Sequence, residues 1–212
     1  MSPNQSFACV LSSVSTSMEN NCIPYERLSD NDPRLLSVGV RWGCENFPSS
    51  SIKWIELGDS IRRNTHLRAL EVSFNPLIDE DLQIGALGAL AQGLSCNDSL
   101  KSLTFRNAVF WRRERFSLMM GRFWCGNPNI ETLQLDNCIV ENSAEWTVLG
   151  KGLNGCTSMK NVTIDSMDLS SSLYILAASL RGDLAKLRLR DCAIDSAHIQ
   201  ALASSWPTPS FI

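Results

Sequence analysis

The sequence predicts a curved α/β solenoid of about six strand-helix units, with parallel strands on the concave face and helices on the convex face. Three observations support this prediction: a recurring apolar frame, helical spacing of apolar residues between its copies, and a recurring turn before each copy. The clearest copy of the frame is IETLQLDNCI, residues 130–139, with apolar residues at its first, fourth and sixth positions. One such unit cannot bury its apolar side alone, so neighbouring units must stack to make a core.

Six copies of the frame follow one another along the chain. Their first positions are Leu35, Leu67, Leu100, Ile130, Met159 and Leu184, which are 32, 33, 30, 29 and 25 residues apart. The fourth positions are Val38, Leu70, Leu103, Leu133, Val162 and Leu187, and the sixth are Val40, Val72, Phe105, Leu135, Ile164 and Leu189. Only 44% of the chain is hydrophobic, so uniformly apolar residues at these positions indicate a real repeat and fix its register.

Positions three to seven of the frame form a short strand whose side chains alternate between the two faces. Positions four and six therefore face the core, while positions three, five and seven face outward. Burial of each Leu or Ile contributes about 1.5–3 kcal/mol of transfer free energy. At the ninth position, Asn75, Cys138 and Cys192 are small polar residues that can meet backbone groups where the chain leaves the strand.

Between the strands, apolar residues recur every three or four positions, which predicts helices with one buried stripe. The stripes are Ile52, Trp54, Leu57 and Ile61; Leu82, Leu87, Leu90 and Leu94; Phe116, Met119, Met120 and Phe123; Trp146, Leu149 and Leu153; Leu169, Leu173, Leu176 and Leu180; and Ile199, Leu202 and Trp206. The turns NDPRL, NTHL, NDSL and NPNI precede four of the strands, and their Asn and Pro residues are expected to end the helix.

The domain organisation follows from these elements. Residues 1–17 are uncharged and rich in Ser, which predicts a disordered tail. Residues 18–34 are expected to cap the first repeat, because a solenoid end needs a cover. The repeat domain then spans residues 35–206, and residues 207–212 form a C-terminal tail.

Composition excludes several classes of function. A net charge of −3 gives no basic footprint for nucleic acid. No apolar run reaches the ~18 residues needed to span a membrane. The N-terminus lacks the positive region of a secretory signal. We therefore expect reduced cysteines and a cytoplasmic location, with the nucleus as the alternative.

The segments GALGALAQGLSCNDSLKSLTF (85–105) and IETLQLDNCIV (130–140) resemble the ribonuclease-inhibitor-like subclass of leucine-rich repeats. The resemblance covers roughly residues 30–205 and implies a leucine-rich-repeat solenoid with a full helix on the convex side of each unit. The same repeat serves inhibitors, immune sensors and GTPase-activating proteins, so the resemblance predicts the fold and leaves the function open.

The expected recognition surface consists of the outward positions five, seven and eight. Asp136 and Asp165 fall in one column, with Arg106 on one side and Arg190 on the other, a pattern that favours a partner of complementary charge. Trp42 and Phe74 are either exposed interface anchors or tucked into the turn after the strand. The partner-binding candidates are Arg41, Trp42, Glu71, Phe74, Arg106, Gln134, Asp136, Asp165, Arg188 and Arg190.

The sequence offers little for catalysis, so we expect no enzyme, no cofactor and no metal site. His66 and His198 lie far apart in the repeat order, and no phosphate-binding loop, nucleophile elbow or zinc-protease motif occurs.

Three functions stay open. The first is a monomeric module that binds a protein partner through its concave strand face. The second is a GTPase-activating regulator of a small GTPase in which Arg112 or Arg115, from a basic cluster at residues 110–115, acts as a charge stabiliser. The third is a truncated or degenerate repeat that needs another chain to complete its core.

Overall fold

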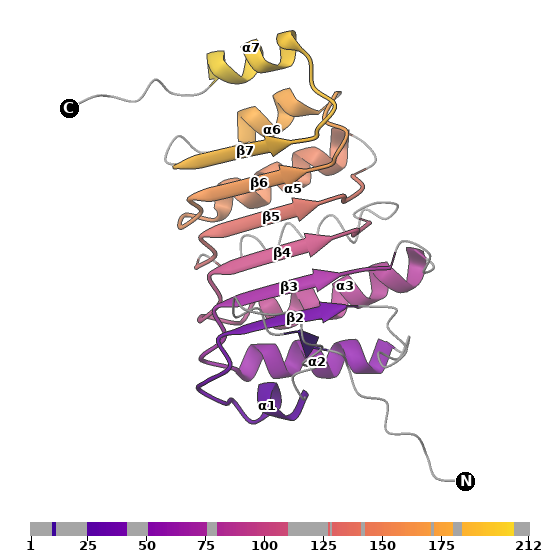
Figure 1. Ribbon diagram of the computed structural model, residues 1–212, viewed down its shortest axis with the longest axis vertical. Helices are drawn as coiled ribbons and strands as arrows, with labels where there is room; N and C mark the ends of the chain where they lie inside the picture. Colours follow the sequence, from indigo (N-terminus) through magenta and orange to yellow (C-terminus); the bar gives the residue numbers. More distant parts are fainter. Residues whose placement is uncertain are drawn as a thin grey trace, which may run out of the picture.

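The computed structural model describes residues 10–11, 25–41, 51–75, 80–109, 127, 129–140, 143–170, 172–179 and 184–205. In this part of the chain, strands follow one another in sequence order across a single open sheet (Figure 1). The parallel strands are β2 (Ser37–Arg41), β3 (Ala69–Ser73), β4 (Ser102–Arg106), β5 (Thr132–Asp136), β6 (Asn161–Asp165) and β7 (Lys186–Arg190). A short strand, β1 (Val10–Leu11), pairs antiparallel with β2.

Helices cover one side of this sheet (Figure 1). They are α1 (Tyr25–Ser29), α2 (Ser51–Arg63), α3 (Glu80–Leu94), α5 (Ser143–Gly155), α6 (Leu173–Ser179) and α7 (Ser196–Ser205). The helix expected around residues 116–123 lies outside the described residues. The alternation of strand and helix confirms the predicted α/β repeat solenoid.

The strand register agrees with the apolar frame. Leu70, Leu103 and Leu133 pair in register across β3, β4 and β5, as do the sixth-position residues beside them. In β2 to β6 every fourth- and sixth-position side chain is at most 2% exposed. The core is therefore the continuous apolar ladder that the repeat predicts.

The last repeat departs from this pattern. Leu187 and Leu189 of β7 are only partly buried, although they continue the same columns as Val162 and Ile164. Within the described residues, β7 pairs with β6 on one side only. Among the described residues, no further strand covers Leu187 and Leu189 as β7 covers Val162 and Ile164.

A ladder of buried asparagines joins the turns that lead into the strands. Asn97 is 1% exposed, and its side chain donates to the carbonyls of Ile61 (2.6 Å) and Asn64 (2.7 Å) in the preceding repeat. Its Oδ1 accepts from the backbone N–H groups of Ser99 (3.0 Å) and Leu100 (2.8 Å). The side chain therefore satisfies backbone groups of two repeats at once.

The same arrangement occurs one repeat earlier and one repeat later. Asn64 donates to the Leu28 carbonyl at 3.2 Å. Asn127 donates to the carbonyls of Leu94 and Asn97, both at 2.8 Å. The asparagines of the turn sequences NTHL, NDSL and NPNI thus hold neighbouring repeats together in addition to ending helices.

Helices α2 and α3 touch at two glycines. A Cβ added at Gly93 would lie 2.1 Å from the Gly58 carbonyl oxygen, and one added at Gly58 would lie 2.6 Å from the Ala89 carbonyl oxygen. Both obstructing atoms belong to the backbone. Only glycine allows the two helices to approach this closely.

At the N-terminal end, α1 packs beside α2 through Leu28, which is 1% exposed. Strand β1 falls within the segment for which we expected a tail, while residues 1–9 and 12–24 lie outside the described residues. The domain boundaries, including the cap over residues 18–34, stay predictions.

Candidate functional site

The candidate site is the side of the sheet away from the helices, which we call the strand face. Its candidate side chains come from the fifth and seventh positions of the frame, which the parallel register aligns in two columns. Third-position residues such as Lys186 lie on the same face. The fifth-position column is Gly39, Glu71, Thr104, Gln134, Thr163 and Arg188. The seventh-position column is Arg41, Ser73, Arg106, Asp136, Asp165 and Arg190.

Arg106 lies at the centre of an ion-pair network on this face. Its Nε contacts Oε1 of Glu71 at 2.9 Å on β3, and its Nη1 contacts Oδ2 of Asp136 on β5. The Asp136 side chain is 20% exposed and the Arg106 side chain 40%. One guanidinium thus links three consecutive strands and holds both carboxylates in place.

The next strands carry a second ion pair in the same column. Nη2 of Arg190 on β7 lies 2.7 Å from Oδ2 of Asp165 on β6, whose side chain is 15% exposed. Asp165 is also the direct neighbour of Asp136 across the β5–β6 pairing. The structure therefore shows the expected column order, with two adjacent carboxylates between Arg106 and Arg190.

The remaining charged and polar candidates continue this surface. Arg41 is exposed at the end of β2, and Arg188 is exposed on β7. Gln134 is partly buried on β5, between Thr104 and Thr163. The strand face is therefore polar along its length, with charge concentrated on β3 to β7.

The aromatic candidates do not extend this surface among the described residues. Trp42 lies outside them. Phe74 is 1% exposed and stacks on Trp54 of α2, with ring centroids 6.0 Å apart. Of the two positions that the sequence left open for Phe74, the structure shows the tucked one, so its expected role as an exposed anchor was wrong. The reason is that the apolar ring reaches the core under the turn.

Residues at the eighth frame position shape the turn after each strand more than they form a recognition surface. Asn107 and Asn137 have φ angles of 53° and 49°, in the left-handed region that asparagine tolerates better than most residues. Asn107 donates to the Phe74 carbonyl at 3.2 Å, and Asn137 donates to Oδ1 of Asn107 at 2.8 Å. These side chains connect successive turns where the chain leaves the sheet.

The structure shows a second charged cluster that the sequence analysis did not predict. Glu131, just before β5, lies between Lys101 (Nζ–Oε1, 3.5 Å) and Lys160 (Nζ–Oε2, 3.2 Å) of the adjacent repeats. The hydrogen bond from Lys160 and its charge, together with the charge of Lys101, lower the pKa of the Glu131 carboxyl. Alternating charge at the second frame position was the signal that could have revealed this group.

The acidic and histidine side chains of the described residues have the following partners. Asp136 and Asp165 already engage guanidinium groups. His198 pairs with Asp195 at 2.6 Å at the start of α7, away from the strand face. The described residues contain no group of three His, Cys, Asp or Glu side chains that could hold a metal ion. The rim cluster with Arg112 and Arg115 lies outside them.

The cysteines of the described residues, Cys96, Cys138, Cys156 and Cys192, carry free thiols. At the ninth frame position, the Cys138 thiol lies 3.5 Å from the Phe105 carbonyl and Cys192 lies 3.5 Å from that of Ile164. Burial raises the pKa of the Cys138 thiol to about 12. This thiol is a buried donor in the turn, as the frame predicts.

Comparison with known proteins gives the class of fold. No protein-family model matches the chain, and no curated protein matches it. The chain is similar to the structure of leiomodin-1 actin-binding site 2, with a TM-score of 0.50 and 14% identity over 85% of this chain and 84% of that one. It is also similar to the leucine-rich repeat-containing protein LegL7 of Legionella pneumophila, with a TM-score of 0.41 and 14% identity, covering 82% of this chain and 64% of that one.

The first of these likenesses agrees in fold alone, because the identity is low. Together with the apolar frame and the open parallel sheet, it defines the chain as a leucine-rich-repeat-like α/β solenoid. No helix among the described residues is both long and apolar enough to cross a membrane.

Proposed function

We propose that this chain is a non-catalytic protein-interaction module that binds its partner through the strand face, the side expected to be concave. The observation that supports the proposal most is the charged network from Glu71 to Arg190. The guanidinium groups of Arg106 and Arg190 are 40% and 49% exposed, and ion pairs with a solvated partner contribute little to stability. Stability alone therefore does not account for five charged groups gathered on one face. They do give a partner a fixed pattern of charge.

The charged residues of the strand face follow a fixed order across the strands. Asp136 and Asp165 form an acidic centre, on strands about 4.8 Å apart. Arg106 lies on one side of them, and Arg188 and Arg190 lie on the other. A partner with basic groups at its centre and acidic groups beside them complements this order.

The test is an affinity capture of partners from a lysate of the source cell, compared across matched charge variants. Arg188→Glu with Arg190→Glu alters the strand face, while Lys151→Glu alters an exposed position on α5. We expect the strand-face variant to lose a partner that wild type and the α5 variant both retain, with melting temperatures within a few degrees of each other. Equal retention by all three proteins would refute the strand face as the binding surface.

Actin is a defined first candidate in this assay, because leiomodin-1 site 2 is described as actin-binding. Co-sedimentation with filaments and binding to monomeric actin test it directly. Absence of binding would remove actin and leave the surface proposal intact, since the shared fold at 14% identity does not carry a partner.

We further propose the ribonuclease-inhibitor-like subclass and a cytoplasmic location. Helices of 13 to 15 residues in α2, α3 and α5 support the subclass. Free thiols at four described cysteines support a reducing compartment. Fractionation of source cells with compartment markers tests the location, and recovery from a secreted fraction would contradict it.

A further inference from the structure

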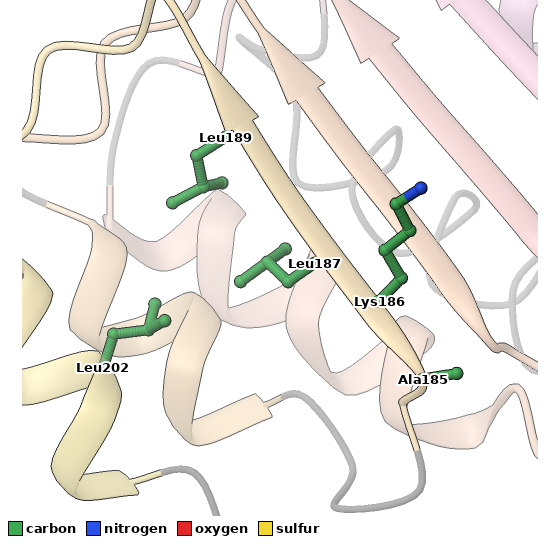
Figure 2. Close-up of a pocket in the computed structure, with 5 residues that line it drawn as sticks. All are labelled: Ala185, Lys186, Leu187, Leu189 and Leu202. Atoms are coloured by element: carbon green, nitrogen blue, oxygen red, sulfur yellow. The ribbon is translucent and has the colours of Figure 1, made fainter.

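Within the described residues β7 is the last strand of the sheet, and its outer edge is a second surface with a chemistry of its own. A shallow groove of about 440 Å³ lies between β7 and α7, lined by Ala185, Lys186, Leu187, Leu189 and Leu202. Figure 2 shows the side chains of Leu187, Leu189 and Leu202 directed into this space, while Lys186 projects from the other side of the strand.

The backbone at this edge offers hydrogen bonds of a known direction. Lys186 donates its N–H to the Lys160 carbonyl, and the Arg190 carbonyl accepts from the Ser166 N–H, so these residues bond toward β6. Because successive residues of a strand point their backbone groups to opposite sides, the N–H and C=O groups of Leu187 and Leu189 point to the open edge. The corresponding groups of Val162 and Ile164 are those that pair β6 with β7.

The charges on β7 are matched only in part by β6. Arg190 pairs with Asp165, but the cross-strand neighbours of Lys186 and Arg188 on β6 are Asn161 and Thr163, which carry no charge. On β4, by contrast, Arg106 pairs with carboxylates of both adjacent strands, Glu71 and Asp136. Among the described residues, no strand that could supply such a carboxylate lies on the side of β7 opposite β6.

We propose that β7 binds an extended segment of a partner protein in which acidic and apolar residues alternate. The segment adds a strand to the sheet, pairing its backbone with Leu187 and Leu189. Its apolar side chains enter the groove beside Leu202. Its acidic side chains lie on the strand face, beside Lys186 and Arg188, at the cross-strand distance of about 5 Å between Cβ atoms.

Charge argues for this occupant over a second copy of the chain. Pairing two β7 strands would bring Lys186, Arg188 and Arg190 against the same three residues of the other copy. Like charges directly opposite each other destabilise strand pairing. Basic residues on an edge strand also deter uncontrolled association, whereas they attract an acidic strand.

The experiment uses the full chain and a labelled nonapeptide of alternating Glu and Leu as the probe. Fluorescence anisotropy measures binding, and hydrogen exchange measures protection of the Leu187 and Leu189 amides. The controls are a scrambled peptide of the same composition and a peptide in which alternate backbone nitrogens along one edge are methylated. We expect saturable binding that weakens with salt, protection of both amides, and loss of binding for one of the two methylation patterns.

Protein variants locate the site. Lys186→Glu with Arg188→Glu should weaken the probe at least tenfold, while Lys151→Glu on α5 should leave it unchanged. A circular dichroism spectrum and melting curve like those of wild type show that the double variant is folded. Equal binding of the scrambled peptide, or an unprotected β7 edge, would overturn the proposal and leave the basic residues a protective role only.

Two other occupants give distinct outcomes without the probe. Protection of both amides that rises with protein concentration, together with a dimer in sedimentation, would assign the edge to a second copy. Protection in the monomer that disappears when the chain is cut after Ser205 would assign it to residues 206–212. Either result would overturn the proposal. The amide-protection and peptide tests read the β7 edge, whereas partner capture repeated with Asp136→Asn and Asp165→Asn reads the strand face without changing β7. The two proposals can therefore fail separately.

Discussion

Replacement of Asn97 by alanine tests the asparagine ladder that joins the repeats. The substitution leaves the N–H groups of Ser99 and Leu100 without their acceptor in a turn where both residues are buried. The Ile61 carbonyl keeps the Asn64 N–H as a donor, and the Asn64 carbonyl keeps the Ser99 hydroxyl, whose single proton it shares with the Leu67 carbonyl. An orphaned buried group costs about 1–3 kcal/mol, so two such groups predict a loss of about 2–6 kcal/mol.

Urea unfolding measures this loss. With a slope of about 1–3 kcal/mol per molar urea, a loss of that size lowers the midpoint by about 0.7 M or more. Asp98→Ala is the matched control, because Asp98 is an exposed neighbour in the same turn and surface changes stay within about 0.5 kcal/mol. A loss below about 1 kcal/mol for Asn97→Ala would refute the view that the ladder holds the repeats together.

Asn97→Asp separates the donor from the acceptor role. The carboxylate keeps the acceptor oxygen for Ser99 and Leu100 but faces the carbonyls of Ile61 and Asn64 without protons to donate. Burial then raises the pKa of this carboxyl in the folded state above the unfolded value of about 3.9. The stability deficit relative to wild type should therefore shrink as pH falls toward that value, and a deficit independent of pH would contradict this assignment.

Three further predictions follow from the core and the cysteines. Gly93→Ala should lower the melting temperature by several degrees, because the added methyl group meets a backbone carbonyl of α2 and overpacking costs about 1–3 kcal/mol. The control is Gly85→Ala, which has open space around it and should raise the melting temperature slightly. Leu135→Asp should abolish cooperative unfolding measured by circular dichroism, because it buries an unpaired charge in the ladder; wild-type stability would mean that the strand register is wrong. At pH 8, Cys96 should react rapidly with a thiol reagent because it is exposed, whereas Cys138 should react only on unfolding because burial raises its thiol pKa to about 12; rapid reaction of both would contradict this burial.

The strand-face network and the β7 edge divide recognition between two kinds of surface. On the strand face, side chains on rigid strands present a fixed order of charge, held by Arg106 and Arg190. At the edge, backbone groups and a groove beside Leu202 are open. One partner that lays a strand on β7 could place its remaining surface over the strand face, so the two proposals are compatible although each can fail alone.

Several features of the fold could be predicted from sequence because each depends on a local pattern. Alternation within strands placed Val72 and Leu135 in the core, and the period of the frame placed Asp136 beside Asp165. Apolar residues three and four apart predicted the helices. These patterns need only the geometry of a strand or a helix, which is the same in every protein.

Other features depend on which atoms of separate repeats meet, and only the tertiary structure decided them. Phe74 occupies an outward position of the frame, yet its ring turns under the strand end to stack on Trp54. Glu131 contacts lysines about thirty residues away on either side. The recurring asparagines were visible in the sequence, but their partners in the previous turn were not.

The sequence by itself thus determined the repeat, its register and the order of charges along the strand face, because these follow from periodicity. The tertiary structure decided which of these charges pair, which aromatic is hidden, and that Leu187 and Leu189 are only partly buried on the last described strand. Contacts between repeats depend on how closely neighbouring units approach, as at Gly58 and Gly93, where two backbones touch. That distance arises from the packing of the whole stack and is not encoded in any single unit.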